Sequence, residues 1–179
     1  LFNHSKTIYQ SEKKAFDLTI DDLFIDLFQK QIPFKLTSSQ KKCIEEIYND
    51  IKKTSPMKRL LQGDVGSGKT IVAAAAVTAT IKNNKQAALM APTEVLAEQH
   101  LTSFKKYLEY FDVDIHLLTS SVKDREDIYE IIDRGDPVLI IGTHALIQDK
   151  VNFNNLGLAI IDEQQWFGVE QRKKLVDND

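Results

Sequence analysis

Eight consecutive residues, 63–70, have the residue types and spacing of a phosphate-binding loop. They read Gly-Asp-Val-Gly-Ser-Gly-Lys-Thr and fit the pattern G-x-x-x-x-G-K-[ST]. The glycines let main-chain N–H groups approach phosphates closely, Lys69 brings a positive charge to the β- and γ-phosphates, and Thr70 offers a hydroxyl to Mg²⁺. The predicted ligand is therefore a nucleotide with Mg²⁺, and the predicted binding residues are Gly63, Asp64, Val65, Gly66, Ser67, Gly68, Lys69 and Thr70.

A second pair of residues suited to chemistry, Asp162 and Glu163, follows an apolar run at 157–161. At the end of a strand, the first carboxylate of such a pair can hold Mg²⁺ while the second orients and deprotonates the attacking water. An Asp in this position also occurs as a helix N-cap. Because a phosphate-binding loop lies upstream, the metal interpretation is favoured. Lys69, Asp162 and Glu163 are the predicted catalytic residues, and Thr70 and Asp162 are the predicted metal ligands.

Apolar segments alternate with helical patterns along the chain, which predicts strands at 57–62, 86–91, 113–118, 137–141 and 157–161. Thr93 can cap a helix whose apolar residues recur every three or four positions, and a second helix is expected from Val122 to Arg134, ending at Gly135. This alternation predicts an α/β fold with a doubly wound, mainly parallel sheet and helices on both faces. Ligands of such folds bind at the carboxyl ends of the strands.

The first 32 residues have a different pattern. An apolar stripe at helical spacing predicts a helical segment over 1–32 that leads in from an upstream domain, and Pro33 ends it. Residues 33–179 form the predicted nucleotide-binding unit, which is expected to stop shortly after the Asp162-Glu163 pair. The stripe consists of Phe16, Ile20, Leu23, Phe24, Leu27 and Phe28.

Composition restricts the class of protein. The chain of 179 residues has a net charge of −3 and 42% hydrophobic residues, which is ordinary for one globular domain. Its single cysteine, Cys43, excludes an internal disulfide and is expected in a helix core, and no run approaches the length of a membrane span. No global basic field indicates nucleic acid, although a local groove can still be basic. Four lysine pairs are expected to be solvated: Lys41-Lys42, Lys52-Lys53, Lys105-Lys106 and Lys173-Lys174.

The order of these motifs resembles that of superfamily 2 helicases, and their amino-acid sequences are most similar to the RecG family of bacterial branched-DNA helicases. The resemblance covers about residues 33–176. It implies a RecA-like P-loop NTPase fold and the first motor lobe of a cytoplasmic, ATP-dependent machine that remodels branched or duplex DNA at stalled forks and junctions. The runs that carry it are Leu36-Thr37 with Gln40, residues 63–70, Ala91–His100, Ile141–Leu146, Asp162–Gln165 and Phe167–Arg172.

Further roles follow from the resemblance alone. Gln40 would read the adenine edge with Phe34 near the base, although Thr37-Ser38-Ser39-Gln40 also fits a capping box. Five residues resemble positions that face the DNA strand. N-capping is the alternative for two of them, Thr93 and Thr119, and local packing is the alternative for His144. The five are Thr93, Glu94, Thr119, Thr143 and His144.

Two residues depart from the RecG pattern, in which the Asp-Glu pair is followed by Gln-His-Arg. Gln165 replaces the histidine that couples this strand to other motor motifs, and Mfd-type transcription-repair translocases carry glutamine there, so that class remains an alternative. Trp166 replaces a charge, and either packs on protein or stacks on a base. The resemblance also implies partners, a second motor lobe and an upstream wedge domain. Because that lobe supplies arginine fingers, the chain alone is expected to hydrolyse ATP poorly. A non-hydrolysing nucleotide-binding module is the alternative from another class.

Overall fold

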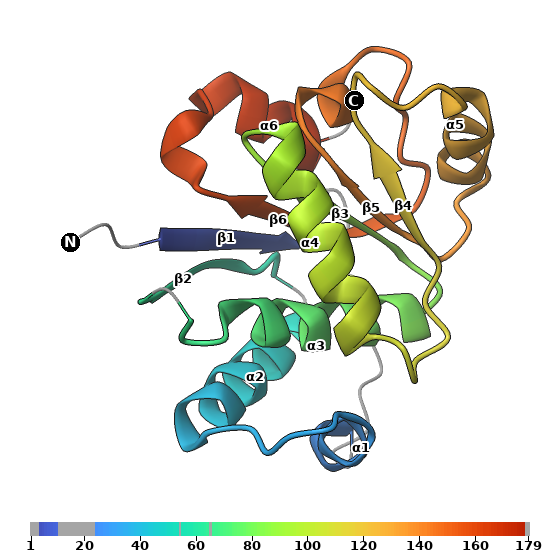
Figure 1. The fold of residues 1–179 in the computed structure, drawn as a ribbon. Coiled ribbons are helices and arrows are strands. Elements are labelled where there is room, and N and C mark those ends of the chain that lie inside the picture. Colours follow the sequence, from blue (N-terminus) through green and yellow to red (C-terminus); the bar gives the residue numbers. More distant parts are fainter. Residues whose placement is uncertain (1–3, 11–23, 54, 65, 178–179) are drawn as a thin grey trace.

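The computed structural model describes residues 4–10, 24–53, 55–64 and 66–177, and its centre is a six-stranded sheet. The strand order is β2-β1-β6-β3-β5-β4, and the strands other than β1 run parallel to one another (Figure 1). The predicted mainly parallel α/β sheet is thereby confirmed. The strands are β1 (His4–Gln10), β2 (Lys58–Gly63), β3 (Gln86–Met90), β4 (Ile115–Leu118), β5 (Leu139–Gly142) and β6 (Leu156–Asp162).

Within the segment 1–32 that was expected to be helical, residues His4–Gln10 form strand β1 instead, whereas Phe24–Gln31 are helical. Strand β1 lies inside the sheet, antiparallel to β2 on one side and to β6 on the other. The register pairs Thr7 with Leu60 and with Ile161, and Ile8 with Arg59 and with Ile160. The run Thr7-Ile8-Tyr9 is rich in β-branched and aromatic residues, which favour strands. Much of the apolar stripe, from Phe16 to Leu23, lies outside the described residues.

Helices cover both faces of the sheet, as predicted (Figure 1). One face packs against α1, α2, α3 and α4, and the other against α5, α6 and the 3-10 turn η1. The helices are α1 (Phe24–Gln31), α2 (Ser38–Ile51), α3 (Lys69–Lys82), α4 (Glu94–Tyr107), α5 (Arg125–Arg134) and α6 (Val169–Asp177), with short 3-10 helices η1 (His144–Ile147) and η2 (Gln164–Trp166).

Local sequence explains where the helices begin and end. The hydroxyl of Thr93 accepts from the Leu96 N–H and caps α4, while Gly135 ends α5 in the left-handed conformation that glycine adopts most readily. Helix α5 begins at Arg125 rather than Val122. Helix α3 is buried at every position from Ile71 to Ile81, because it lies between the sheet and its neighbouring helices. Cys43 of α2 is partly buried against the core.

None of the helices in the described part of the chain has the length and hydrophobicity needed to cross a membrane.

Candidate nucleotide site and motor lobe

The phosphate-binding loop joins β2, which ends at Gly63, to α3, which begins at Lys69. Gly66 and Gly68 have φ angles of 81° and 82°, a left-handed conformation that side chains rarely adopt. A Cβ atom at Gly68 would lie 2.1 Å from Nε2 of Gln40, so a side chain there would displace this amide from the carbonyl of Ser67. The loop is therefore built to expose main-chain N–H groups. Val65 lies outside the described residues.

The side chain of Lys69 lies over this loop. Its ammonium donates to the carbonyl oxygens of Gly63, at 2.7 Å, and of Asp64, at 2.8 Å. It also lies 3.5 Å from the hydroxyl oxygen of Ser67. These contacts fix a positive charge at the N-terminus of α3, where the main-chain dipole already favours an anion.

Asp162 is the last residue of β6, and both of its carboxylate oxygens have partners. Nζ of Lys6 lies 3.0 Å from Oδ1, and Nε2 of His100 lies 2.6 Å from Oδ2. Burial alone would raise the pKa of this carboxyl, but the hydrogen bond from His100 and the charge of Lys6 lower it to about 2. Asp162 is therefore held as a buried anion at the carboxyl end of the central strands.

Glu163 lies next to this anion in a left-handed conformation, with a φ of 50°. Its side chain is buried, and its carboxylate accepts a hydrogen bond from Nε2 of Gln165. Gln165, which replaces the histidine of the RecG pattern, therefore contacts Glu163, the predicted catalytic glutamate. A left-handed non-glycine residue at such a place is a common feature of functional sites.

Lys6 connects the two halves of the site. Burial lowers its pKa, the nearby charge of Lys69 lowers it further, and Asp162 and Glu163 act in the opposite direction. Asp162 contacts Lys6 directly, and the loop that leads to Lys69 follows β2, the neighbour of β1 on its other side. The structure brings together residues separated by most of the chain, because β1 places Lys6 between β2 and β6.

The predicted Mg²⁺ ligands fit a metal that is held mainly by substrate. Thr70 lies in the first turn of α3 and Asp162 at the end of β6, and the described residues contain no group of three or more His, Cys, Asp or Glu side chains suited to a metal. Mg²⁺ in nucleotide enzymes commonly takes one or two protein ligands and completes its coordination with phosphates and water. One carboxylate and one hydroxyl are consistent with that mode.

Comparison with known proteins decides the family, because the DEAD/DEAH box helicase family matches residues 37–178. This chain is a DEAD/DEAH box helicase domain. Among curated relatives it is similar to the ATP-dependent DNA helicase RecG of Bacillus subtilis, 53% identical over 150 residues, and to that of Aquifex aeolicus, 46% identical over 168 residues. These matches cover 83% and 93% of this chain but only 22% and 21% of the relatives. The chain thus spans about a fifth of their length.

A solved structure gives the same result for the fold. The structure described as RecG bound to a three-way DNA junction matches with a TM-score of 0.74 and 40% identity, over 80% of this chain and 20% of that one. The predicted RecA-like fold and the predicted similarity to RecG are therefore confirmed. They also explain why the sequence motifs occur in helicase order.

Gln40 is part of a capping box at the start of α2, which was the alternative to adenine recognition in the sequence analysis. Its Oε1 accepts from the Thr37 N–H, and its own N–H donates to the Thr37 hydroxyl. Nε2 of the same amide donates to the carbonyl of Ser67, so Gln40 also links α2 to the phosphate-binding loop. Adenine recognition by Gln40 stays a prediction. Phe34 packs edge-on against Tyr107 of α4 and remains 38% exposed.

The residues predicted to face DNA lie at the ends of three neighbouring strands, β3, β5 and β4. Thr93 is the N-cap of α4, and the adjacent Glu94 accepts a hydrogen bond from Ser120. Thr119 does not cap a helix, because α5 begins at Arg125. Its side chain is buried, with its hydroxyl 2.9 Å from that of Ser121, and the contact of Thr119 with DNA stays a prediction.

Two further residues of this region differ in exposure. Thr143 is buried at the start of η1, whereas His144 is exposed with its ring against that of Phe167, at a centroid distance of 5.2 Å. His144 therefore shows the packing contact that was its alternative, and the DNA contact stays a prediction. Trp166 is 71% exposed, which rules out tight packing on the described part of the chain.

Sequence reasoning missed the two residues that hold Asp162. His100 lies in the helix capped by Thr93, three residues after the buried Ala97 and four before the buried Phe104, so its position on the inner face could have been recognised. Lys6 had a weaker signal, the strand-forming run that follows it. A single charged residue before such a run does not indicate where in a sheet the strand will pair.

Proposed function

We propose that this domain is the ATP-binding first motor lobe of a RecG-type DNA helicase, which uses ATP hydrolysis to remodel branched DNA in repair and recombination. The observation that carries the proposal is that the phosphate-binding loop and the buried Asp162-Glu163 pair follow the same ends of β2 and β6, on either side of β1, in a DEAD/DEAH box domain whose relatives are RecG helicases. A phosphate cradle, a buried carboxylate and a second, hydrogen-bonded carboxylate are the parts that phosphoryl transfer to water requires.

Each residue has a defined task in this proposal. The main-chain N–H groups of the loop hold the phosphates, and the Lys69 ammonium exchanges its carbonyl partners for phosphate oxygens. Asp162 and Thr70 would hold Mg²⁺, which when bound neutralises charge on the phosphates. Glu163 orients the attacking water and takes up its proton at a carboxylate oxygen. The hydrogen bond from Gln165 fixes the direction of that carboxylate, and coupling of this strand to other motor motifs by Gln165 stays a prediction.

Communication with DNA would use the strand ends beside this site. Glu94 and Ser120 link the start of α4 to the turn after β4, and Thr93 and His144 present polar groups at the same edge. Hydroxyl groups and helix N-termini bind phosphates without reading base sequence, which suits a motor that moves along DNA. A motor of this kind would depend on a second lobe to complete ATP hydrolysis.

A chimera tests this proposal. Residues of this chain replace the matching 150-residue segment of the Bacillus subtilis RecG helicase, and ATP hydrolysis is measured with forked DNA and with linear duplex. We expect forked DNA to stimulate the chimera, and Lys69→Ala to abolish the stimulation. Lys105→Ala, an exposed lysine of α4, is the matched control.

The alternatives give different results in the same assay. Equal stimulation by linear and forked DNA, with the parent helicase still preferring forks, would favour a general translocase such as the Mfd type. A chimera that binds ATP but never hydrolyses it, and in which Glu163→Gln changes nothing, would favour a non-hydrolysing binding module.

A further inference from the structure

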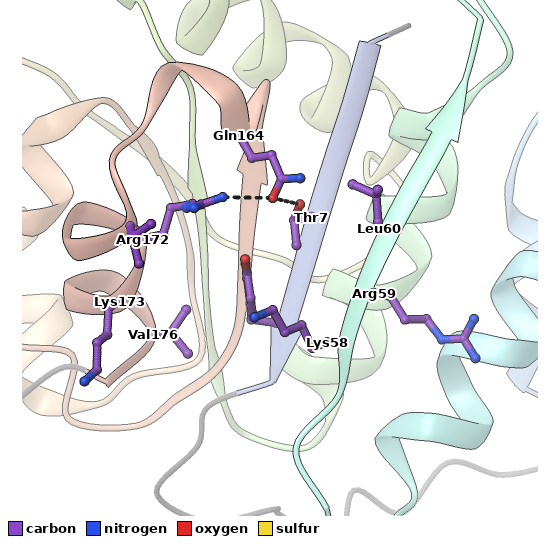
Figure 2. A pocket seen from close by; sticks show the side chains of 10 residues that line it. Thr7, Lys58, Arg59, Leu60, Gln164, Arg172, Lys173 and Val176 are labelled. Carbon is purple, nitrogen blue, oxygen red and sulfur yellow. Dashed lines mark hydrogen bonds between the residues drawn. The ribbon is translucent and has the colours of Figure 1, made fainter.

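A groove of about 550 Å³ lies on the face of the sheet that α6 only partly covers (Figure 2). Its floor is formed by β1 and β2, and α6 forms one side. This groove lies over β2, β1 and β6, whereas the residues predicted to face DNA lie at the ends of β3, β5 and β4. Thr7 and Tyr9 of β1 line the groove, and because successive side chains of a strand point to opposite faces, Lys6 and its contact with Asp162 lie on the other face of the sheet.

The charge of the groove is positive. Lys58, Arg172 and Lys173 line it, and no Asp or Glu is among the described residues that do so. Arg59 also borders it, but Figure 2 shows its side chain pointing away toward α2, where it pairs with Glu46 and Asp50. A surface lined by several cations favours a ligand with repeated negative charges.

Polar groups suited to phosphate lie between these cations. The hydroxyl of Thr7 donates to Oε1 of Gln164 at 2.6 Å, and the guanidinium of Arg172 lies 3.3 Å from the same oxygen. The ammonium of Lys58 lies 5.5 Å from the centre of the Tyr9 ring. These contacts hold a guanidinium, an amide and an ammonium along the groove, on three different elements, β2, η2 and α6.

An exposed aromatic side chain lies at the same 3-10 turn. Trp166 follows Gln164 by two residues and is 71% exposed, although large apolar side chains are usually shielded from water. Binding surfaces for single-stranded nucleic acid combine a basic groove that follows the backbone with aromatic rings on which bases stack. An acidic peptide would use the cations but would have no use for the exposed indole ring.

We propose that this groove holds the sugar–phosphate backbone of a single nucleic-acid strand, with a base stacked on Trp166. Lys58 and Arg172, the latter held by Gln164, contact phosphates of the strand. The site extends the proposed function, because it is a second place at which the domain meets nucleic acid, yet it does not depend on the ATP site.

Titration of the 179-residue chain with a single-stranded oligonucleotide of about 15 nucleotides tests this proposal, with the fluorescence of its one tryptophan as the signal. We expect the strand to quench Trp166. The Lys58→Gln/Arg172→Gln variant should bind about tenfold more weakly, and the slope of log K against log salt should fall by about 1.4. The matched control, Lys105→Gln/Lys106→Gln on α4, should change affinity less than twofold.

Other outcomes would overturn the proposal. Equal affinity of the groove variant and the control variant excludes phosphate contacts in this groove, provided that both have the melting temperature of the parent. Competition by poly-glutamate as strong as that by the oligonucleotide, without quenching, would identify a general polyanion surface instead. Lys69→Ala distinguishes the two proposals, because it removes nucleotide binding at the motor site and leaves strand binding in the groove unchanged.

Discussion

Replacement of Lys6 by methionine tests whether β1 belongs between β2 and β6. The Lys6 and Asp162 side chains are 4% and 9% exposed, and their charged atoms lie 3.0 Å apart. At this distance, with an effective dielectric constant of about 20, two unit charges attract by roughly 5 kcal/mol. Desolvation offsets part of this attraction, and removal of one partner from a buried pair typically costs about 3–5 kcal/mol.

We expect Lys6→Met to lower the free energy of unfolding by about 3 kcal/mol, at the lower end of that range, because Asp162 keeps its hydrogen bond with His100. Urea unfolding followed by far-UV circular dichroism measures the change, since the exposed Trp166 is a poor reporter of the core. Lys41→Met on α2, where the lysine is exposed, should change stability by less than about 0.5 kcal/mol.

The same substitution should change nucleotide binding in the opposite direction. If Asp162 holds Mg²⁺, the Lys6 ammonium would compete for Oδ1, so Lys6→Met should strengthen Mg²⁺-dependent ATP binding while it weakens the fold. If Lys6 has only a structural role, the substitution should weaken both the stability of the fold and Mg²⁺-dependent ATP binding. If Lys6→Met and Lys41→Met have equal stability, β1 does not pair with β6 in solution and the placement of Lys6 is refuted.

Three further predictions concern stability. The pKa of Asp162 is lowered from 3.8 to about 2, so its stabilising contribution of roughly 2 kcal/mol is present above pH 4 and is lost as the pH falls toward 2. Urea unfolding should show this loss of stability in the wild-type chain and no such loss in Asp162→Asn. Gly68→Ala should destabilise the chain and weaken ATP binding more than Gly66→Ala, since both have positive φ but only a Cβ at Gly68 meets another side chain; equal effects would contradict the close approach. Gln86→Leu should cost about 2–3 kcal/mol in thermal or urea unfolding, because its buried amide bonds two main-chain groups, and a neutral result would exclude those bonds.

Much of the fold could be predicted because its signals are local. The apolar runs that became β5 and β6 are buried on both faces, and such strands are nearly continuous in apolar residues. Thr93 and Gly135 marked the ends of helices, because capping depends on one or two residues. The loop at 63–70 could be recognised since each of its residue types is required by contact with phosphate.

The parts that sequence did not reveal depend on contacts between distant segments. More than 140 residues of chain separate β1 from β6, with which it pairs. Nothing near Lys6 in the sequence indicates Asp162 as its partner. The hydrogen bond from Gln165 to Glu163 likewise depends on the left-handed conformation of Glu163, which an apolar strand ending in Asp-Glu does not specify. Thr119 was expected to face DNA, but its side chain is buried. The sequence could not show this, because the exposure of Thr119 depends on how the following turn folds back.

Nucleotide binding by the chain itself tests the central claim most directly. A fluorescent ATP analogue is titrated into the wild-type chain, Lys69→Ala and Glu163→Gln, with and without Mg²⁺. We predict Mg²⁺-dependent binding that Lys69→Ala weakens by about tenfold or more and that Glu163→Gln retains, because Lys69 contacts phosphate and Glu163 acts on water. Unchanged affinity in Lys69→Ala would contradict the assignment of residues 63–70 as the nucleotide site, and with it the motor lobe.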